Sequence, residues 1–180
     1  RERAARSHTD HDRVRLVFQL FPLLGAGGLG VRPGVVGIGE LIDEQGQSLR
    51  SPLDRIECKD QKPHRRLAHL LKSLNMCDPV FGLYRTDYLK KTQLIGPFCG
   101  ADYVLLGELA MLGQIWEIDE ILFRLRAHPN RSMQANANAR ARTAWYNPAA
   151  AKKLIVLPDW EQMVWQMSKS ALRAPLSSSE

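Results

Sequence analysis

One acidic residue stands where a helix is expected to begin. In the stretch GADYVLLGELAMLG, residues 100–113, Asp102 follows a Gly/Pro-rich loop at residues 96–100. A carboxylate within hydrogen-bonding distance of a hydroxyl group can act as a general base, and the glycine-rich loop leaves room for a substrate. The helix dipole would favour the ionised form of this side chain. The pattern therefore makes Asp102 a candidate catalytic base.

A purely structural role would explain the same residue. Aspartate at the start of a helix accepts hydrogen bonds from free backbone N–H groups and suits the positive end of the helix dipole. The helix itself is predicted from Leu105, Leu109 and Leu112, which form one apolar stripe, and from Gly113, which ends it. Sequence alone leaves both roles for Asp102 open.

The composition indicates a globular protein. The chain has 180 residues, of which 44% are hydrophobic and 24% charged, enough for one ordinary domain with a core. Its net charge of +6 is spread over separate basic clusters, and the aromatic residues, 7% of the chain, are absent from them. Nucleic-acid binding is therefore disfavoured. An anionic small substrate and the headgroup region of a membrane both remain compatible with this charge.

The cysteines and the apolar segments suggest where the protein works. Cys58, Cys77 and Cys99 contain no C-x-x-C pair, so neither a disulfide framework nor a zinc site is indicated, and we expect a reducing cytoplasm. The apolar run at residues 16–31 is short for a membrane span and contains Pro22. Acidic residues before it and the lack of a cleavage site disfavour a signal peptide.

The order of predicted elements is that of an α/β domain. Strands are indicated by alternating or β-branched apolar runs, and helices by apolar positions at helical spacing. In the first part of the chain these patterns predict a strand end, a Gln45–Gly46 turn and a return strand in LIDEQGQSL, and then a helix in HRRLAHLLKSL that packs on a sheet. A strand at 79–85 with a short helix after it and the helix at 101–112 follow. The last predicted segments are extended stretches at 115–118 and 121–126, and a polar loop or lid at 130–148.

A C-terminal amphipathic helix is predicted in LPDWEQMVWQMSKSAL. Its apolar face would combine Trp160, Met163, Val164 and Met167. Such a stripe packs in a core or against a partner, and in some proteins it lies on a membrane surface.

The ordered set of segments from LIDEQGQ to LRAHPNRS resembles the second half of family 2 glycosyltransferases. The parts that match in order are VFGLYRTDYLKKT, the loop LIGPF before an acid, the helix LLGELAMLG, the strand EIDEILFRLR and a terminal R-x-H, within roughly residues 41–148. The resemblance implies a GT-A fold, an α/β domain whose N-terminal half binds a nucleotide-diphosphate sugar. It also implies a divalent metal, Mn or Mg, held mainly by that half.

The resemblance implies a role for Asp102. In the family, the matching acid removes the proton from an acceptor hydroxyl while its oxygen attacks the anomeric carbon with inversion, in polysaccharide or glycan synthesis. The acceptor would be a glycan or a lipid-linked glycan, and the enzyme would work in the cytoplasm or at the inner face of the membrane. Ala101 stands where the family more often has Glu, which puts the choice of acceptor in doubt.

Further residues follow from the same match. His128 corresponds to a histidine near the metal and diphosphate, and the match favours this role over that of a surface-loop histidine before Pro129. Arg126 and Arg131 would neutralise the leaving diphosphate, and Gly100 would line the substrate site.

The expected organisation has three parts. Residues 1–40 form an atypical segment, frameshifted or disordered, residues 41–148 the C-terminal half of a GT-A domain, and residues 149–180 the amphipathic helix and tail. Asp10 and Asp12 resemble a metal-binding Asp-x-Asp pair in poorly matching surroundings. Because too few residues precede Leu41 to form a donor-binding half, we expect a fragment that is inactive alone. The alternative is a non-catalytic protein-interaction domain, with Asp102 only a helix cap.

Overall fold

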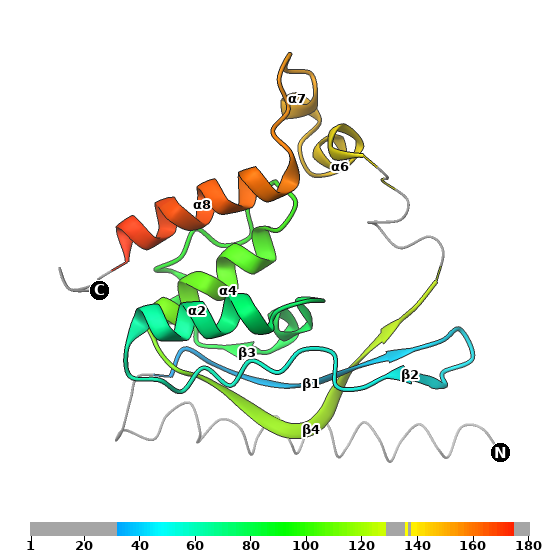
Figure 1. The fold of residues 1–180 in the computed structure, drawn as a ribbon, viewed down its shortest axis with the longest axis vertical. Helices are drawn as coiled ribbons and strands as arrows, with labels where there is room; N and C mark the ends of the chain where they lie inside the picture. The colour runs from blue at the N-terminus through cyan, green and yellow to red at the C-terminus, as the bar shows by residue number, and fades with distance from the viewer. Residues whose placement is uncertain (1–31, 129–135, 137, 175–180) are drawn as a thin grey trace. The chain divides into compact units, whose positions relative to one another are not determined.

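The computed structural model describes residues 32–128, 136 and 138–174. These residues form a mixed α/β fold in which helices α2 (Pro63–Ser73) and α4 (Ala101–Leu112) lie on one side of a four-stranded sheet, and α8 (Asp159–Arg173) packs on α4 (Figure 1). The α/β class predicted from the sequence is confirmed at this level.

Strand β1 (Gly34–Ile42) is the centre of the sheet. Strand β4 (Ile115–Arg126) runs parallel to it along its whole length. The other edge of β1 pairs antiparallel with β3 (Leu83–Tyr84) near its start and with β2 (Ser48–Arg50) near its end. The apolar sequence GVVGIGELI is buried along most of its length, as befits a central strand. This strand runs across the boundary between residues 40 and 41 that the sequence suggested.

The β1–β2 hairpin forms as predicted. The backbone of Gly46 has a φ of 87°, a left-handed conformation that favours glycine. The Asp43 carboxylate accepts a hydrogen bond of 2.7 Å from the Gln47 amide and closes the turn.

The predicted helix over HRRLAHLLKSL is α2, but its inner face differs from the leucine pattern. Leu70 is fully buried in one cluster with Val36 of the sheet, whereas Leu71 is exposed. Arg66 is buried instead, and its guanidinium donates to the carbonyls of Ala110 (2.6 Å) and Met111 (3.0 Å) at the end of α4. An arginine can occupy this position because it satisfies the free carbonyls of a helix C-terminus.

Several local predictions were wrong in detail. The strand expected at residues 79–85 is a 3₁₀ helix, η1 (Asp78–Phe81), followed by the two-residue β3. The short helix expected after it is α3 (Thr86–Leu89), which was predicted to be capped by Thr86; Arg85 occupies the cap position instead and provides no side-chain bond. The two extended segments after Gln114 are one strand, β4. Part of the expected polar loop is helical, forming α6 (Ala139–Tyr146) and α7 (Pro148–Ala151).

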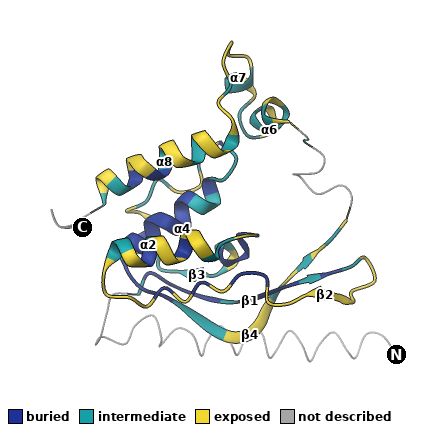
Figure 2. Ribbon diagram, in the orientation of Figure 1, coloured by how far each residue is buried: buried dark blue, intermediate teal, exposed yellow. Residues whose placement is uncertain are grey.

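Helix α4 is buried on nearly all sides (Figure 2). Val104, Leu106, Leu109 and Ala110 have no measurable exposure. Because α4 lies between α2, the sheet and α8, an amphipathic pattern is not needed, and apart from Asp102 and Glu108 its sequence is mainly apolar. Gly113 ends the helix, as predicted.

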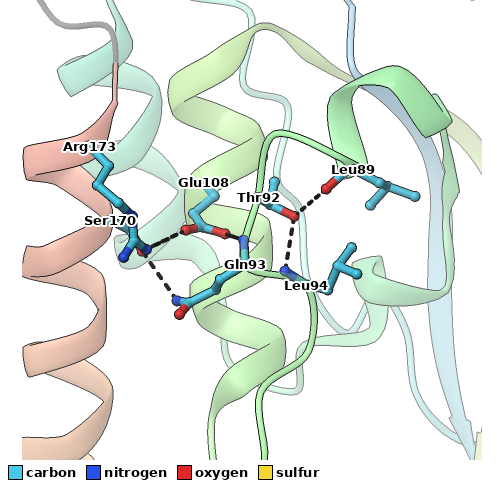
Figure 3. Close-up of polar contacts among 7 residues, drawn as sticks. All are labelled: Leu89, Thr92, Gln93, Leu94, Glu108, Ser170 and Arg173. Carbon is cyan, nitrogen blue, oxygen red and sulfur yellow. Dashed lines mark hydrogen bonds and ion pairs between the residues drawn. The ribbon is translucent and has the colours of Figure 1, made fainter.

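A buried carboxylate fastens α8 to α4. Glu108 accepts hydrogen bonds from the backbone N–H of Gln93 (2.9 Å) and the Ser170 hydroxyl (2.7 Å), and forms an ion pair with Arg173 (3.2 Å; Figure 3). Such a carboxylate tolerates burial because its oxygens are hydrogen-bonded.

The apolar face expected for α8 is divided in two. Met163 and Met167 pack towards α4, where Met167 is buried, whereas Trp160 and Val164 are exposed. The serine at position 170, not Val164, continues the inner face. None of the helices among the described residues combines the length and apolar character needed to cross a bilayer.

Candidate functional site

Asp102 lies in the first turn of α4, as its sequence position indicates. The helix begins after Gly100, whose φ of 83° is left-handed, and Gly100 rather than Asp102 is the cap residue. Asp102 Oδ1 accepts a hydrogen bond of 3.0 Å from the backbone amide of the adjacent Tyr103. Helix capping therefore engages one oxygen of this carboxylate among the described residues.

Asp102 and Gly100 line an open cavity of about 540 Å³. Its walls come from the segment at residues 75–81, the start of α4, the outer half of β4, and the region where α6 and α8 meet. Its lining side chains include the acids Asp78, Asp102 and Asp159 and the aromatic residues Phe81, Phe123 and Trp160. A cavity of this size accommodates a ligand of one or two sugar rings.

The cavity combines aromatic faces with carboxylates. Phe81 and Phe123 stack with their ring centroids 4.4 Å apart, and Trp160 is 68% exposed on the first turn of α8. Asp102 and Asp159 line it with carboxyl groups, whereas the carboxyl oxygens of Asp78, another lining residue, are themselves buried. No lysine or arginine occurs among the described residues of its lining. Such a surface suits a neutral ligand with many hydroxyl groups better than an anionic one.

A buried aspartate shapes one wall of the cavity. The Asp54 carboxylate accepts hydrogen bonds from three consecutive backbone amides, those of Asn75 (2.9 Å), Met76 (2.9 Å) and Cys77 (2.7 Å). It comes from the segment before α2, whose buried residues the sequence did not reveal. Three amides converging on one carboxylate fix the backbone that leads to Asp78.

Asp78 is a buried acid without a hydrogen-bond partner among the described residues. The residue is only 4% exposed, and neither carboxyl oxygen makes such a bond. A Cβ at Gly39 of β1 would lie 2.0 Å from its Oδ2, so the absence of a side chain at Gly39 makes room for the carboxyl group. Burial, and next the neighbouring Asp54 carboxylate, raise the pKa of Asp78 to about 7.

We expect Asp78→Asn to stabilise the protein above neutral pH. In the unfolded chain this carboxyl loses its proton near pH 4, whereas the folded chain keeps it to about pH 7. Between these values the folded state binds more protons, so the group lowers the free energy of unfolding as pH rises. The substitution should flatten that slope and raise the free energy of unfolding at pH 8 by at least about 1 kcal/mol, measured by urea denaturation.

The matched control is Asp60→Asn, on an exposed acid whose pKa is lowered, chiefly by a hydrogen bond from the Lys62 amide. It should leave the falling slope between pH 4 and 7 in place. If Asp78→Asn shows the same pH dependence as the unaltered protein, Asp78 is not the group that titrates there.

The cysteine beside the site is not activated. Burial, and next the charge of Asp102, raise the pKa of the Cys77 thiol well above its ordinary value. A thiol that stays protonated is a poor nucleophile, so covalent cysteine chemistry is disfavoured at this position.

The structure brings together only part of the predicted site. Arg126 donates hydrogen bonds to the carbonyls of Asp43 (2.8 Å) and Glu44 in the β1–β2 turn, so its guanidinium stabilises the hairpin. His128 is exposed after the end of β4 and does not line the cavity. Arg131, Asp10 and Asp12 lie outside the described residues.

The chain has no match in any of three comparisons. No family model, no curated protein and no solved structure is similar to it. Its function therefore has to be argued from the cavity and its residues.

The described residues do not supply a metal site. No group of three or more His, Cys, Asp and Glu side chains among them is arranged to hold an ion. The divalent metal implied by the family resemblance therefore finds no such group of ligands among the described residues.

Sequence reasoning missed several residues of the cavity. Asp54 and Asp78 are far apart in the sequence and show no spacing motif. Phe81 and Phe123 belong to different elements whose contact depends on the sheet. Trp160 was noted in the sequence, but as part of the apolar face of the C-terminal helix rather than as an exposed side chain at a cavity.

Proposed function

We propose that this chain is the acceptor-binding part of an inverting glycosyltransferase with a GT-A fold, similar to family 2. The observation that carries the proposal is the position of Asp102, half-buried at a helix start and lining an open cavity of about 540 Å³. The reaction would transfer a sugar from a nucleotide-diphosphate donor to a hydroxyl group.

Asp102 would act as the general base. As the acceptor oxygen forms its bond to the anomeric carbon, the hydroxyl proton passes to the Asp102 carboxylate and the nucleoside diphosphate leaves with the bonding electron pair. Attack opposite the leaving group inverts the anomeric configuration. The positive end of α4 favours the carboxylate before the reaction.

The cavity lining supports the acceptor, not the donor, as its ligand. A nucleoside diphosphate calls for cations, and the described lining contains none. The aromatic faces of Phe81, Phe123 and Trp160 suit the apolar face of a sugar ring, and the carboxylates accept hydrogen bonds from its hydroxyl groups. The donor and a divalent metal would be bound by another part of the enzyme.

A saccharide titration tests the proposal on the chain itself. A panel of neutral glycosides and oligosaccharides is added while tryptophan fluorescence is recorded, and we expect a saturable change with at least one of them. Trp160→Leu should remove the change because Trp160 lines the cavity. Trp165→Leu is the matched control, since Trp165 is exposed on the same helix and does not line the cavity.

Two results would contradict the proposal. Absence of binding by every saccharide would remove the acceptor role and favour the non-catalytic interaction domain. Equal loss of the signal in Trp165→Leu and Trp160→Leu would place the binding surface outside the cavity.

A further inference from the structure

The loop that joins α7 to α8 exposes large apolar side chains to solvent. In this segment, residues 152–157, Leu154 is 95% exposed and Ile155 76%, and Leu157 is also exposed. Burial of such side chains is ordinarily a main source of stability, so a soluble surface does not favour two of them side by side. Their position calls for a contact outside the described residues.

The backbone of this loop is held in place. From α6, Arg140 donates to the carbonyls of Ala151, Lys153 (3.2 Å) and Leu154 (3.4 Å). The side chain of Asn147 caps α7 by accepting a bond of 3.1 Å from the Ala150 amide. The loop is thus built so that its carbonyls face Arg140 while its apolar side chains stay in solvent.

The surroundings of the loop are basic. Lys152 and Lys153 precede the apolar side chains and are both exposed. The whole stretch from residue 121 to residue 158 contains several arginines and lysines but no aspartate or glutamate. Of the acids that follow, Asp159 is paired with Arg142, and Glu161 is exposed on α8.

Exposed tryptophans flank the loop on both sides. Trp145 lies on α6 and Trp160 on the first turn of α8, and both are more than half exposed. Tryptophan is enriched where proteins meet the interface between lipid headgroups and acyl chains. In Figure 1, α7 and the loop project beyond the N-terminal end of α8.

We propose that the 152–157 loop binds the surface of a membrane that contains anionic phospholipids. Leu154 and Ile155 would enter the boundary between headgroups and acyl chains, while Lys152 and Lys153 contact headgroup phosphates. Charge complementarity favours this occupant over a protein surface, because clustered basic residues beside an apolar tip match an anionic bilayer. The binding is reversible, since only a short segment inserts.

Vesicle co-sedimentation of the 180-residue chain tests the proposal. Vesicles of phosphatidylcholine are compared with vesicles containing roughly 30% phosphatidylserine, a content that gives a marked negative surface potential. We expect clear retention on the anionic vesicles, at least fivefold less on the neutral ones, and weaker retention as salt rises.

Two double variants separate the contributions of the loop. Leu154→Ser with Ile155→Ser should reduce retention about tenfold or more, through lost insertion. Lys152→Ala with Lys153→Ala should reduce it to a similar degree on anionic vesicles only. All four side chains are exposed, so both proteins should keep the unaltered melting temperature. The control Leu172→Ser, on a side chain exposed at the far end of α8, should change nothing.

Three outcomes would overturn the proposal. They are equal retention on neutral and anionic vesicles, retention that survives both double variants, and absence of vesicle binding together with self-association that the Leu154→Ser and Ile155→Ser changes abolish. The last would identify the loop as a contact between copies of the chain. None of these results depends on whether the cavity binds a saccharide.

Discussion

Asp102→Asn is expected to lower the rate of sugar transfer by about 10²- to 10⁴-fold, the range ordinarily contributed by a general base. The amide keeps an oxygen that can accept the Tyr103 N–H bond, so the start of α4 should persist. It cannot take up the proton of an acceptor hydroxyl. The rate is measured as nucleoside diphosphate release from a polypeptide in which a donor-binding half accompanies this chain.

The chain offers a matched control for this substitution. Asp87 also lies in the first turn of a helix, α3, but it pairs with Arg85 and does not line the cavity. Asp87→Asn should therefore leave the transfer rate within about twofold and the melting temperature nearly unchanged. An unaltered rate in Asp102→Asn would leave this residue with a structural role only.

Loss of rate and loss of binding can also be told apart. A general base acts in the transition state, so Asp102→Asn should lower kcat more than it raises KM. The affinity measured by saccharide titration should remain close to that of the unaltered chain. If affinity falls as much as the rate, Asp102 is a ligand-binding residue and another group removes the proton.

The sequence predicted those features that depend on the conformational preferences of single residues, such as turns and helix ends. The Gln45–Gly46 turn needs a left-handed residue, and Gly46 provides it. Gly113 ends α4, as the low helix propensity of glycine predicts. The strand at residues 34–42 was obscured because three glycines interrupt its apolar pattern, and what makes it a strand is pairing along both edges.

Elements that depend on distant residues were not predictable in this way. From the sequence, Arg66 is expected to face solvent. It is buried because it bonds to the end of α4, which packs against α2. Leu71 fits the apolar stripe of α2 but faces solvent, since Arg66 takes part of the inner surface. The same limit applies to the site. A helix start identified Asp102, whereas the aromatic pair Phe81 and Phe123 in the same cavity exists only because η1 and β4 meet.

The two inferences about binding share one region of the molecule. Trp160 and Tyr146 line the cavity, and both belong to the elements that border the 152–157 loop. If the proposed function holds, binding of the loop to a membrane would bring the cavity near the bilayer surface. A lipid-linked acceptor would then reach Asp102 without leaving the membrane. The basic charge of this region would in this way favour a lipid-linked substrate.

Asp54→Ala is expected to destabilise the protein by about 3 kcal/mol, because several buried amides lose one charged acceptor together. The amides of Asn75, Met76 and Cys77 all donate to this carboxylate. Their segment forms a wall of the cavity, so saccharide binding should weaken as well. Urea denaturation gives the first quantity and fluorescence titration the second.

Two companion variants give this result its meaning. Asp54→Asn keeps one acceptor oxygen and should cost less than Asp54→Ala, whereas Asp60→Ala removes an exposed carboxylate with a single backbone bond and should cost under about 1 kcal/mol. Both Asp54 variants also remove the neighbouring charge that helps raise the pKa of Asp78, so that pKa should fall from about 7. Equal stability losses at positions 54 and 60 would mean that the three amides find other acceptors. A drop in stability without a change in saccharide affinity would mean that this segment is needed for folding but not for binding. The wall that carries Asp78 would then be no part of the binding site.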